Sequence, residues 1–284
     1  MIRPFAIRLS LAVLVALFCA IPTFAQQTEQ TDDGALKLAE PDFTLIGLPT
    51  ALRLPKFGSA FRVTHRFTRA LGSGDFGDLS ADLFGIDSGA QIGLEYRFGI
   101  IPNGQIGVHR TSDRTTEFFA QYGVMRQGPR RPLEIMALAS IEAPNNFKES
   151  KTPALGVILS RRVGGVAAFY VEPIWVNNSN PLPKEVVDHN DTFMVGVGAR
   201  VRVRPTVYLV GEVSPRASGY KPGSTHGGFA IEKRAGGHTF QLNFSDSFGT
   251  TMGQIARGGV TGIDSNQAET RNWYMGFNIS RKFF

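Results

Sequence analysis

The sequence predicts an all-β protein, a single up-and-down antiparallel transmembrane β-barrel of about twelve strands. Three observations lead to this fold class. Apolar and polar residues alternate in many short segments, the connections between these segments alternate between short and long, and no stretch after the N-terminal leader is apolar for long enough to form a membrane helix. Together these features favour strands over helices as the membrane-crossing elements.

The first 25 residues have the parts of a secretory signal peptide. Arg3 and Arg8 make its start positive, residues 9–21 form an apolar run, and small residues precede the expected cleavage site after Ala25. A transmembrane anchor would need about 20 apolar residues, more than this run contains. We therefore expect an exported chain whose mature form begins after Ala25.

Cysteine and charge usage exclude several classes of protein. The one cysteine, Cys19, lies in the leader, so the mature chain can hold neither a disulfide nor a thiolate metal site. Loss of the leader lowers the formal net charge from +6 to +4, and charges of both signs are scattered along the chain. Because there is no basic run, we expect no nucleic-acid partner.

Strand-like alternation is clearest at residues 192–203. Every second residue from Phe193 to Val203 is apolar, whereas the intervening positions hold a methionine, two glycines, Arg200 and Arg202. Since residues i and i+2 of a strand point to the same side, one face is apolar and the other is small and cationic. The same alternation predicts strands at residues 60–68, 89–98, 104–111, 115–126, 133–143, 153–162, 166–176, 192–203, 205–214, 227–234, 238–246 and 270–284.

The connections between these strands alternate in length, with one short exception at residues 111–115. Short turns rich in Gly, Pro or Asn are expected at residues 99–103, 127–132, 163–165, 204–205 and 235–237. Longer links are expected at residues 69–88, 144–152, 177–191, 215–226 and 247–269. Outer-membrane barrels place their short turns in the periplasm. We therefore expect both mature termini to be periplasmic, residues 26–58 to form a periplasmic lead or partial plug, and residues 59–284 to form the barrel.

The direction of the apolar faces separates a membrane barrel from a secreted soluble β-protein. A soluble protein would pack these faces into a core, whereas a membrane barrel turns them toward lipid. Glycines on the polar faces suit a crowded interior, aromatic residues lie near strand ends, and the segments are close to the roughly 9–11 residues that cross a bilayer. These features favour a bacterial outer-membrane barrel, and a secreted soluble β-protein is the lesser alternative.

Charged residues on the polar faces are the candidate lumen-lining groups. They are Arg62, Arg66, Glu95, Arg97, Glu117, Arg200, Arg202, Arg204, Glu212, Glu232 and Arg234. Charges of both signs would either fill the interior with a network of salt bridges or line a water-filled path. In the second case the row Arg200, Arg202 and Arg204 would favour anions. Strand number leaves both interpretations open, because about twelve lies between filled barrels of about 8 strands and porin channels of about 16 to 18.

Chemistry-bearing motifs are absent from the sequence. None of the five histidines is followed two residues later by a serine, which a barrel hydrolase would use on one strand face, and no HExxH, P-loop or EF-hand spacing occurs. The cluster DHND at residues 188–191 fits a polar turn better than a metal site. We therefore expect no enzymatic activity, no metal and no cofactor.

The C-terminal segment NWYMGFNISRKFF, residues 272–284, is expected to close the barrel against the first strand. Its apolar face runs through Trp273 and Phe277 toward lipid. In bacterial outer-membrane barrels, which this chain resembles, a terminal phenylalanine is commonly read by the barrel-assembly machinery, and this implies that Phe283 and Phe284 are the candidate assembly signal. The apolar register runs through Phe283, which leaves open which of the two is read.

Several short motifs are shared with a known family. They are Leu48 to Thr50, Leu54 to Lys56, His65 to Phe67, Leu83 to Asp87, and Glu95 to Tyr96. With them the chain resembles the membrane-bound β-barrel family catalogued as domain of unknown function 5777, over most of residues 40–284. The resemblance implies a bacterial outer-membrane barrel and a structural role for His65 and Arg66 at the periplasmic end of the lumen. It implies no activity.

We expect passive passage or binding of small polar solutes, anionic ones among them. The alternative is a non-conducting anchor or scaffold for a periplasmic or surface partner. The expected partners are outer-membrane lipid, the barrel-assembly machinery and a small polar solute. Neither the solute nor the oligomeric state follows from the residues.

Overall fold

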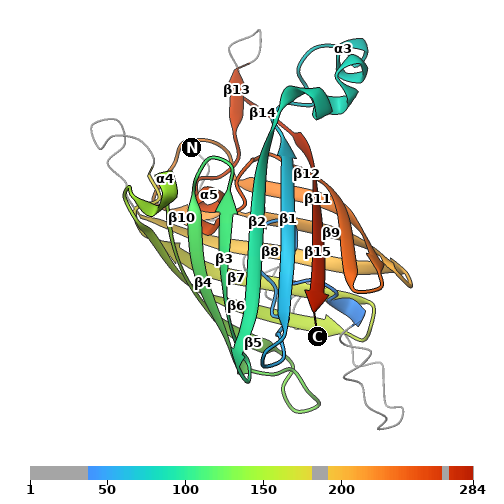
Figure 1. The fold of residues 1–284 in the computed structure, drawn as a ribbon, viewed down its shortest axis with the longest axis vertical. Coiled ribbons are helices and arrows are strands. Elements are labelled where there is room, and N and C mark those ends of the chain that lie inside the picture. Colours follow the sequence, from blue (N-terminus) through green and yellow to red (C-terminus); the bar gives the residue numbers. More distant parts are fainter. Residues whose placement is uncertain (1–37, 181–190, 264–268, 284) are drawn as a thin grey trace, which may run out of the picture. The chain divides into compact units, whose positions relative to one another are not determined.

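The computed structural model describes residues 38–180, 191–263 and 269–283, all within the compact unit Asp33–Phe284. Twelve antiparallel strands of this part close a ring, in which each strand pairs with its neighbours along the chain and β15 returns to β1 (Figure 1). The strands are β1 (Ser59–Phe67), β2 (Ala90–Ile101), β3 (Gly104–Thr111), β4 (Thr116–Met125), β5 (Glu134–Ala143), β6 (Thr152–Val163), β7 (Ala167–Val176), β8 (Thr192–Arg204), β9 (Val207–Ser214), β11 (His226–Ala235), β12 (His238–Ser245) and β15 (Tyr274–Phe283). The predicted all-β, twelve-stranded barrel is confirmed.

Ring closure joins the two ends of the sheet. Ser59 of β1 is opposite Phe283 of β15, and the pairing continues to Arg66 opposite Gly276. In Figure 1 the red β15 lies directly beside the blue β1. No edge is left between these two strands, which removes the exposed backbone groups that an open sheet would present.

Three short strands lie outside the ring. β10 (Arg216–Ser218) adds to β8, while β13 (Thr261–Ile263) and β14 (Glu269–Arg271) form a separate pair. The predicted last strand was therefore too long, because residues 269–271 belong to that pair and β15 begins at Tyr274. Alternation alone did not reveal the break, since Asn272 and Trp273 continue it.

Short helices occupy several long connections. They are α3 (Phe76–Ala81), the 3₁₀-helix η1 (Leu83–Ser88), α4 (Pro144–Phe147) and α5 (Met252–Ala256). Within the described residues, no helix is long and apolar enough to cross a membrane. Five tight turns gather at one end of the barrel, here called the tight-turn end, and the long connections gather at the other, the long-loop end.

The two faces of the strands differ as the alternation predicts. Outward residues such as Leu94, Phe118 and Ile231 are about half exposed, whereas inward residues such as Arg200 and Glu232 are fully buried. Large apolar side chains that point away from the ring are the arrangement of a barrel embedded in lipid.

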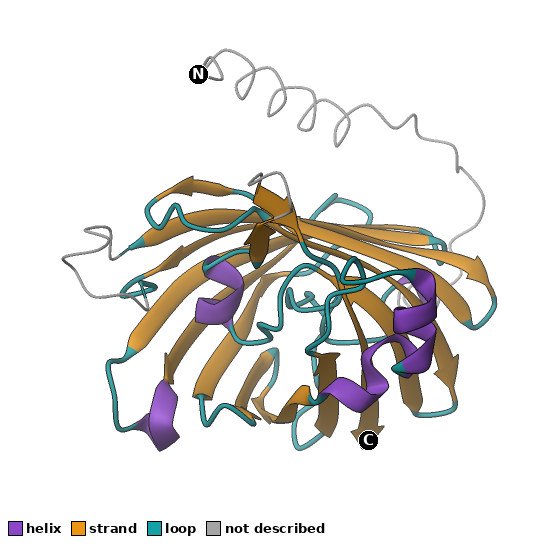
Figure 2. Ribbon diagram, turned by 90° about the horizontal axis from the view of Figure 1, so that it is seen from above, coloured by secondary structure: helices purple, strands orange, loops and turns teal. Residues whose placement is uncertain are grey.

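The interior of the ring is occupied. Figure 2 shows loops and a short helix within the ring of strands. Every residue from Ala39 to Ala51 is buried, as are all five residues of α5. Residues 39–54 are called the internal segment below.

Candidate functional site: the occupied interior

The internal segment makes a tight turn at its tip. Thr44 and Pro49 form an isolated antiparallel bridge, and the Leu45 N–H donates to the Leu48 carbonyl at 2.8 Å. The turn leaves the N–H groups of residues 46, 47 and 48 without partners inside the segment itself. These three donors meet the barrel wall.

Glu212 of β9 accepts all three donors. Its Oε2 lies 2.9 Å from the Ile46 nitrogen and 3.1 Å from the Leu48 nitrogen, and its Oε1 lies 2.9 Å from the Gly47 nitrogen. Successive backbone N–H groups that converge in this way form a nest for an anion. Here the anion is a carboxylate of the barrel wall.

Glu212 is also the inner end of a chain of polar contacts. His226 Nε2 lies 3.2 Å from Glu212 Oε1, and His226 Nδ1 lies 3.0 Å from Asp246 Oδ1. Arg271 of β14 donates from Nε to Asp246 Oδ2 at 2.6 Å. Burial by itself raises the pKa of Asp246, but its hydrogen bond and ion pair with His226 outweigh this and hold the pKa below its ordinary value. The chain connects the long-loop end with the tip of the internal segment.

The carbonyl groups at the tip are held by donors from other strands. Arg200 Nη2 donates to the Thr44 carbonyl at 2.6 Å, Gln241 Nε2 to the Leu45 carbonyl at 2.8 Å, and Asn278 Nδ2 to the Ile46 carbonyl at 3.1 Å. Backbone groups of a buried turn need such partners, because leaving them unpaired is costly. The wall thereby satisfies a segment that has no sheet of its own.

Interior glycines make room for the apolar side chains of the tip. A Cβ atom at Gly198 would overlap Leu45 Cδ1, and one at Gly196 would lie 2.9 Å from Leu48 Cδ1. The Gly228 position is similar, with Ile46 Cδ1 at 3.0 Å. The glycines on the polar strand faces thus permit close approach of the internal segment.

The start of the internal segment is fixed by ionisable groups. Tyr170 donates to Glu40 Oε1 at 2.7 Å, and Arg162 Nη1 lies 3.3 Å from Glu40 Oε2. Burial raises the pKa of Glu40, and Arg162 only partly opposes this. Ser280 of β15 donates to Asp42 Oδ2 at 2.8 Å.

α5 fills the interior from the long-loop end. The Met252 N–H donates to Glu117 Oε1 at 3.2 Å, and the Gly253 N–H donates to Glu142 Oε2 at 2.8 Å. The two fillings meet, since a Cβ atom at Gly47 would lie 2.9 Å from Ile255 Cδ1. Between them lies a cavity of about 30 Å³, lined by residues of both fillings such as Gly47 and Met252.

Most of the predicted lumen-lining residues are buried among these contacts. Buried in the interior are Arg62, Arg66, Glu95, Arg97, Glu117, Arg200, Glu212 and Glu232. Glu95 lies between two of the arginines, 2.6 Å from Arg62 Nη2 and 2.8 Å from Arg97 Nη2. Arg200 pairs with Glu232 at 3.0 Å.

The remaining predicted lumen residues lie toward the tight-turn end. Arg202 and Arg234 are half-buried and Arg204 is exposed, beyond a register shift between β8 and β9. Of the row of three arginines, Arg200 alone bonds the internal segment. The row therefore spans three environments rather than one continuous wall.

Two further predictions concern the strand ends. His65 and Arg66 were expected near the tight-turn end, which is wrong, because both lie in the half of β1 that leads into the long connection to β2. The His65 ring points outward and stacks on Phe277, with ring centroids 4.7 Å apart. Phe283 is exposed at the end of β15, and Phe284 lies outside the described residues.

Several contact residues were not selected from the sequence. Gln241 and Asn278 lie on predicted polar faces, but only ionisable residues were chosen there. His226 stands one residue before a predicted strand, so its orientation was not assigned. Among the described residues there is no group of three or more His, Cys, Asp or Glu that could hold a metal ion. The DHND cluster lies outside the described residues except for Asp191.

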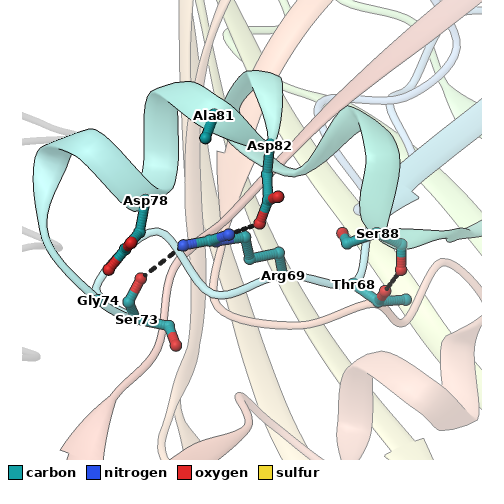
Figure 3. A pocket seen from close by; sticks show the side chains of 8 residues that line it. All are labelled: Thr68, Arg69, Ser73, Gly74, Asp78, Ala81, Asp82 and Ser88. Atoms are coloured by element: carbon teal, nitrogen blue, oxygen red, sulfur yellow. Dashed lines mark hydrogen bonds and ion pairs between the residues drawn. The ribbon is translucent and has the colours of Figure 1, made fainter.

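A separate polar recess of about 570 Å³ lies in the connection between β1 and β2 (Figure 3). Arg69 pairs with Asp82 and donates to the Ser73 carbonyl at 3.0 Å, and Thr68 donates to the Ser88 carbonyl at 2.6 Å. Most of the polar groups of this recess thus bond to one another. Their contacts indicate that they hold the connection in shape.

One protein family and several solved structures resemble this chain. The model of the family described as membrane bound beta barrel domain (DUF5777) matches residues 42–283. The NanC porin structure has a TM-score of 0.51 at 7% identity, covering 80% of this chain and 100% of that one. An outer-membrane channel from Pseudomonas putida F1 has a TM-score of 0.50 at 10% identity, covering 82% and 98%. At such identities the likeness is one of fold, and no curated protein matches the sequence.

Proposed function

Because this chain belongs to the membrane bound beta barrel domain family (DUF5777), we propose that it is an outer-membrane channel for small polar solutes that is closed by its internal segment. Solutes pass when the segment leaves the interior. The tight-turn end, where both Ser59 and Phe283 lie, faces the periplasm.

The observation that carries this proposal is the chemistry of the contacts between the segment and the wall. Arg200, Glu212 and Asn278 bind backbone groups of the segment, and water can replace backbone groups as hydrogen-bond partners. A wall of such groups remains compatible with water once the segment has left. An apolar wall would not.

The glycines support the same proposal. Gly196, Gly198 and Gly228 have no side chain to occupy the space that Leu45, Leu48 and Ile46 fill. Departure of the segment therefore leaves hollows along the wall rather than side chains that collapse inward. The two solved barrels of similar fold, a porin and an outer-membrane channel, are compatible with this proposal.

A reversible tether of the segment tests the proposal. The Asp42 and Ser280 side chains are in contact, so the double variant D42C/S280C places two thiols at this contact between the segment and β15. Formation of the disulfide is verified by mass spectrometry before conductance is compared. The mature chain contains no other cysteine. We expect single-channel openings of the reduced protein in planar bilayers and silence after oxidation, while the two single-cysteine variants conduct regardless of redox state.

The second candidate function is a non-conducting anchor. The observation that favours it is the filling of the interior from both ends, with a cavity of about 30 Å³ between the internal segment and α5. If the reduced double variant and Glu212→Ala both migrate as folded barrels on unheated gels yet never conduct, the channel proposal fails and the anchor stands.

A further inference from the structure

The tight-turn end of the barrel holds a recess of about 580 Å³ with a marked excess of positive charge. Its cationic lining residues are Arg53, Lys56, Arg126, Arg162, Arg234 and Lys282. Its acidic ones are Glu40 and Glu134. The volume falls in the range of about 300 to 1,000 Å³ that is usual for small-molecule sites.

The two carboxylates are already engaged by two of the cations. Glu134 pairs with Arg53 at 2.9 Å and also with Arg162, and Glu40 pairs with Arg162 at 3.3 Å. The charges of Arg53 and Arg162 are therefore compensated, whereas neither carboxylate pairs with any of the other four cations.

The other four cations have no carboxylate partner among the described residues. Arg126 donates to Asn103 Oδ1 at 3.2 Å, and Lys282 donates to the Pro41 carbonyl at 2.5 Å. Lys56 lies over the Phe57 ring. The Arg234 side chain makes no hydrogen bond or ion pair within the described part of the chain. Four positive charges around one recess repel one another, and an anion bound between them would offset this repulsion.

The strand order places these cations on opposite sides of the recess. β4, which ends just before Arg126, and β11, which carries Arg234, are separated by five strands in either direction around the ring. Positive charge therefore lies on both sides of the recess, which favours a solute with more than one charged group over a monovalent one. Arginine suits this role because its planar group binds carboxylate or phosphate through two hydrogen bonds.

One of the surrounding turns adds positive charge, and none adds negative charge. The turn between β4 and β5 carries Arg126, Arg130 and Arg131, and the five tight turns contain no acidic residue. The connection between β1 and β2 at the opposite end contains four aspartates. The resulting field draws anions toward the tight-turn end.

We propose that this recess binds a small solute that carries at least two carboxylate or phosphate groups. The proposal deepens the proposed function, since it names the class of solute that the channel admits, and for transport it rests on that function. Binding at the recess does not require passage, because the recess is open while the internal segment is in place.

Calorimetric titration of the refolded mature protein in neutral detergent at low ionic strength tests the site. Citrate and pyrophosphate are the probes and acetate is the monovalent control. We expect both probes to bind at least about ten-fold more tightly than acetate. Equal affinity for acetate overturns the proposal.

Substitutions locate the site. Arg126→Gln and Arg234→Gln break no ion pair, so the barrel keeps its fold, and each is expected to weaken citrate binding about ten-fold. Lys233→Gln is the matched control, because Lys233 carries the same charge but lies exposed on the outer face of β11. If Lys233→Gln weakens citrate binding as much as Arg234→Gln does, the affinity depends on the net charge of the protein and not on the recess, and the proposed site is overturned.

Carboxylates of the chain itself and lipid headgroups are two other ligands that could occupy the recess, and two further experiments distinguish them from a free solute. Glu29, Asp32 and Asp33 of the mature N-terminus could supply carboxylates to the recess. If citrate binds the variant E29Q/D32N/D33N but not the unchanged protein, these carboxylates occupy the recess, and the solute proposal is overturned. Binding that is lost in nanodiscs containing phosphatidylglycerol but kept in phosphatidylcholine assigns the recess to lipid headgroups and also overturns it. Oxidised D42C/S280C must still bind citrate. If citrate binds but neither the unchanged protein nor any variant conducts, the binding site stands and the proposed channel function fails.

Discussion

Glu212 and His226 face each other inside the barrel, with the carboxylate Oε1 3.2 Å from the imidazole Nε2. On its other side Glu212 binds three consecutive N–H groups of the internal segment, and His226 binds Asp246. One carboxylate therefore joins the segment to residues of the long-loop end. The first two predictions below follow from this arrangement.

Replacement of Glu212 by alanine should release the tip of the internal segment. Three buried N–H groups would lose their acceptor, at a cost of about 1 to 3 kcal/mol each where water does not enter. A Leu48→Cys reporter in this background should react with maleimide much faster than in an otherwise unchanged barrel. Glu212→Gln, which keeps an oxygen acceptor, should fall between the two, and equal labelling of all three would contradict the assigned role.

Asp246 should make the stability of the barrel sensitive to acid. Its pKa is lower in the folded protein than the ordinary value of 3.8, so it contributes stability above about pH 4 that is lost as the pH falls through the lowered pKa. The groups that face it are His226 and Arg271. We expect the melting temperature, followed by circular dichroism, to fall between pH 7 and pH 3. The fall should be smaller in Asp246→Asn than in the unchanged protein.

A single methyl group at Gly198 should disturb the internal segment. The added Cβ would overlap Leu45 Cδ1, so Gly198→Ala should destabilise docking by about 1 to 3 kcal/mol. Gly198→Ala should cost much less when it is added to the single variant Leu45→Ala than when it is added to the unchanged protein, because L45A removes the overlapping atoms. Gly211→Ala on the neighbouring strand is the control, since a Cβ there has no neighbour closer than 4.0 Å. Denaturant titration of the four variants measures the effect, and equal loss in Gly198→Ala and Gly211→Ala would refute this packing.

Phe283 should matter more for assembly than Phe284. Phe283 is paired with Ser59 of β1, and its exposed side chain continues the outward apolar register of β15. We expect Phe283→Ala to lower the fraction of protein that migrates as a folded, heat-modifiable barrel, and deletion of Phe284 to lower it less. The opposite order would identify the terminal residue as the signal.

Alternation of side chains in the sequence was enough to predict the ring of strands. In residues 192–203 the period of two fixes which side chains face outward, whatever lies inside, because successive residues of a strand point to opposite faces. Turn residues such as Pro205 and the pair Gly236–Gly237 mark where strands reverse. These are local properties, and they do not depend on contacts between distant segments.

The sequence left open whether residues 26–58 form a periplasmic lead or a partial plug, and the contacts inside the ring were decided by tertiary structure alone. The internal segment has no period, and its tip is held through backbone groups of Thr44, Ile46 and Gly47, which every sequence possesses. The depth of a residue along its strand then separates Arg200, buried against Glu232, from Arg204, exposed at the strand end. The sequence determined on which face of its strand each side chain lies, because this follows from backbone geometry. Which groups each side chain contacts depends on where the closed ring places distant parts of the chain.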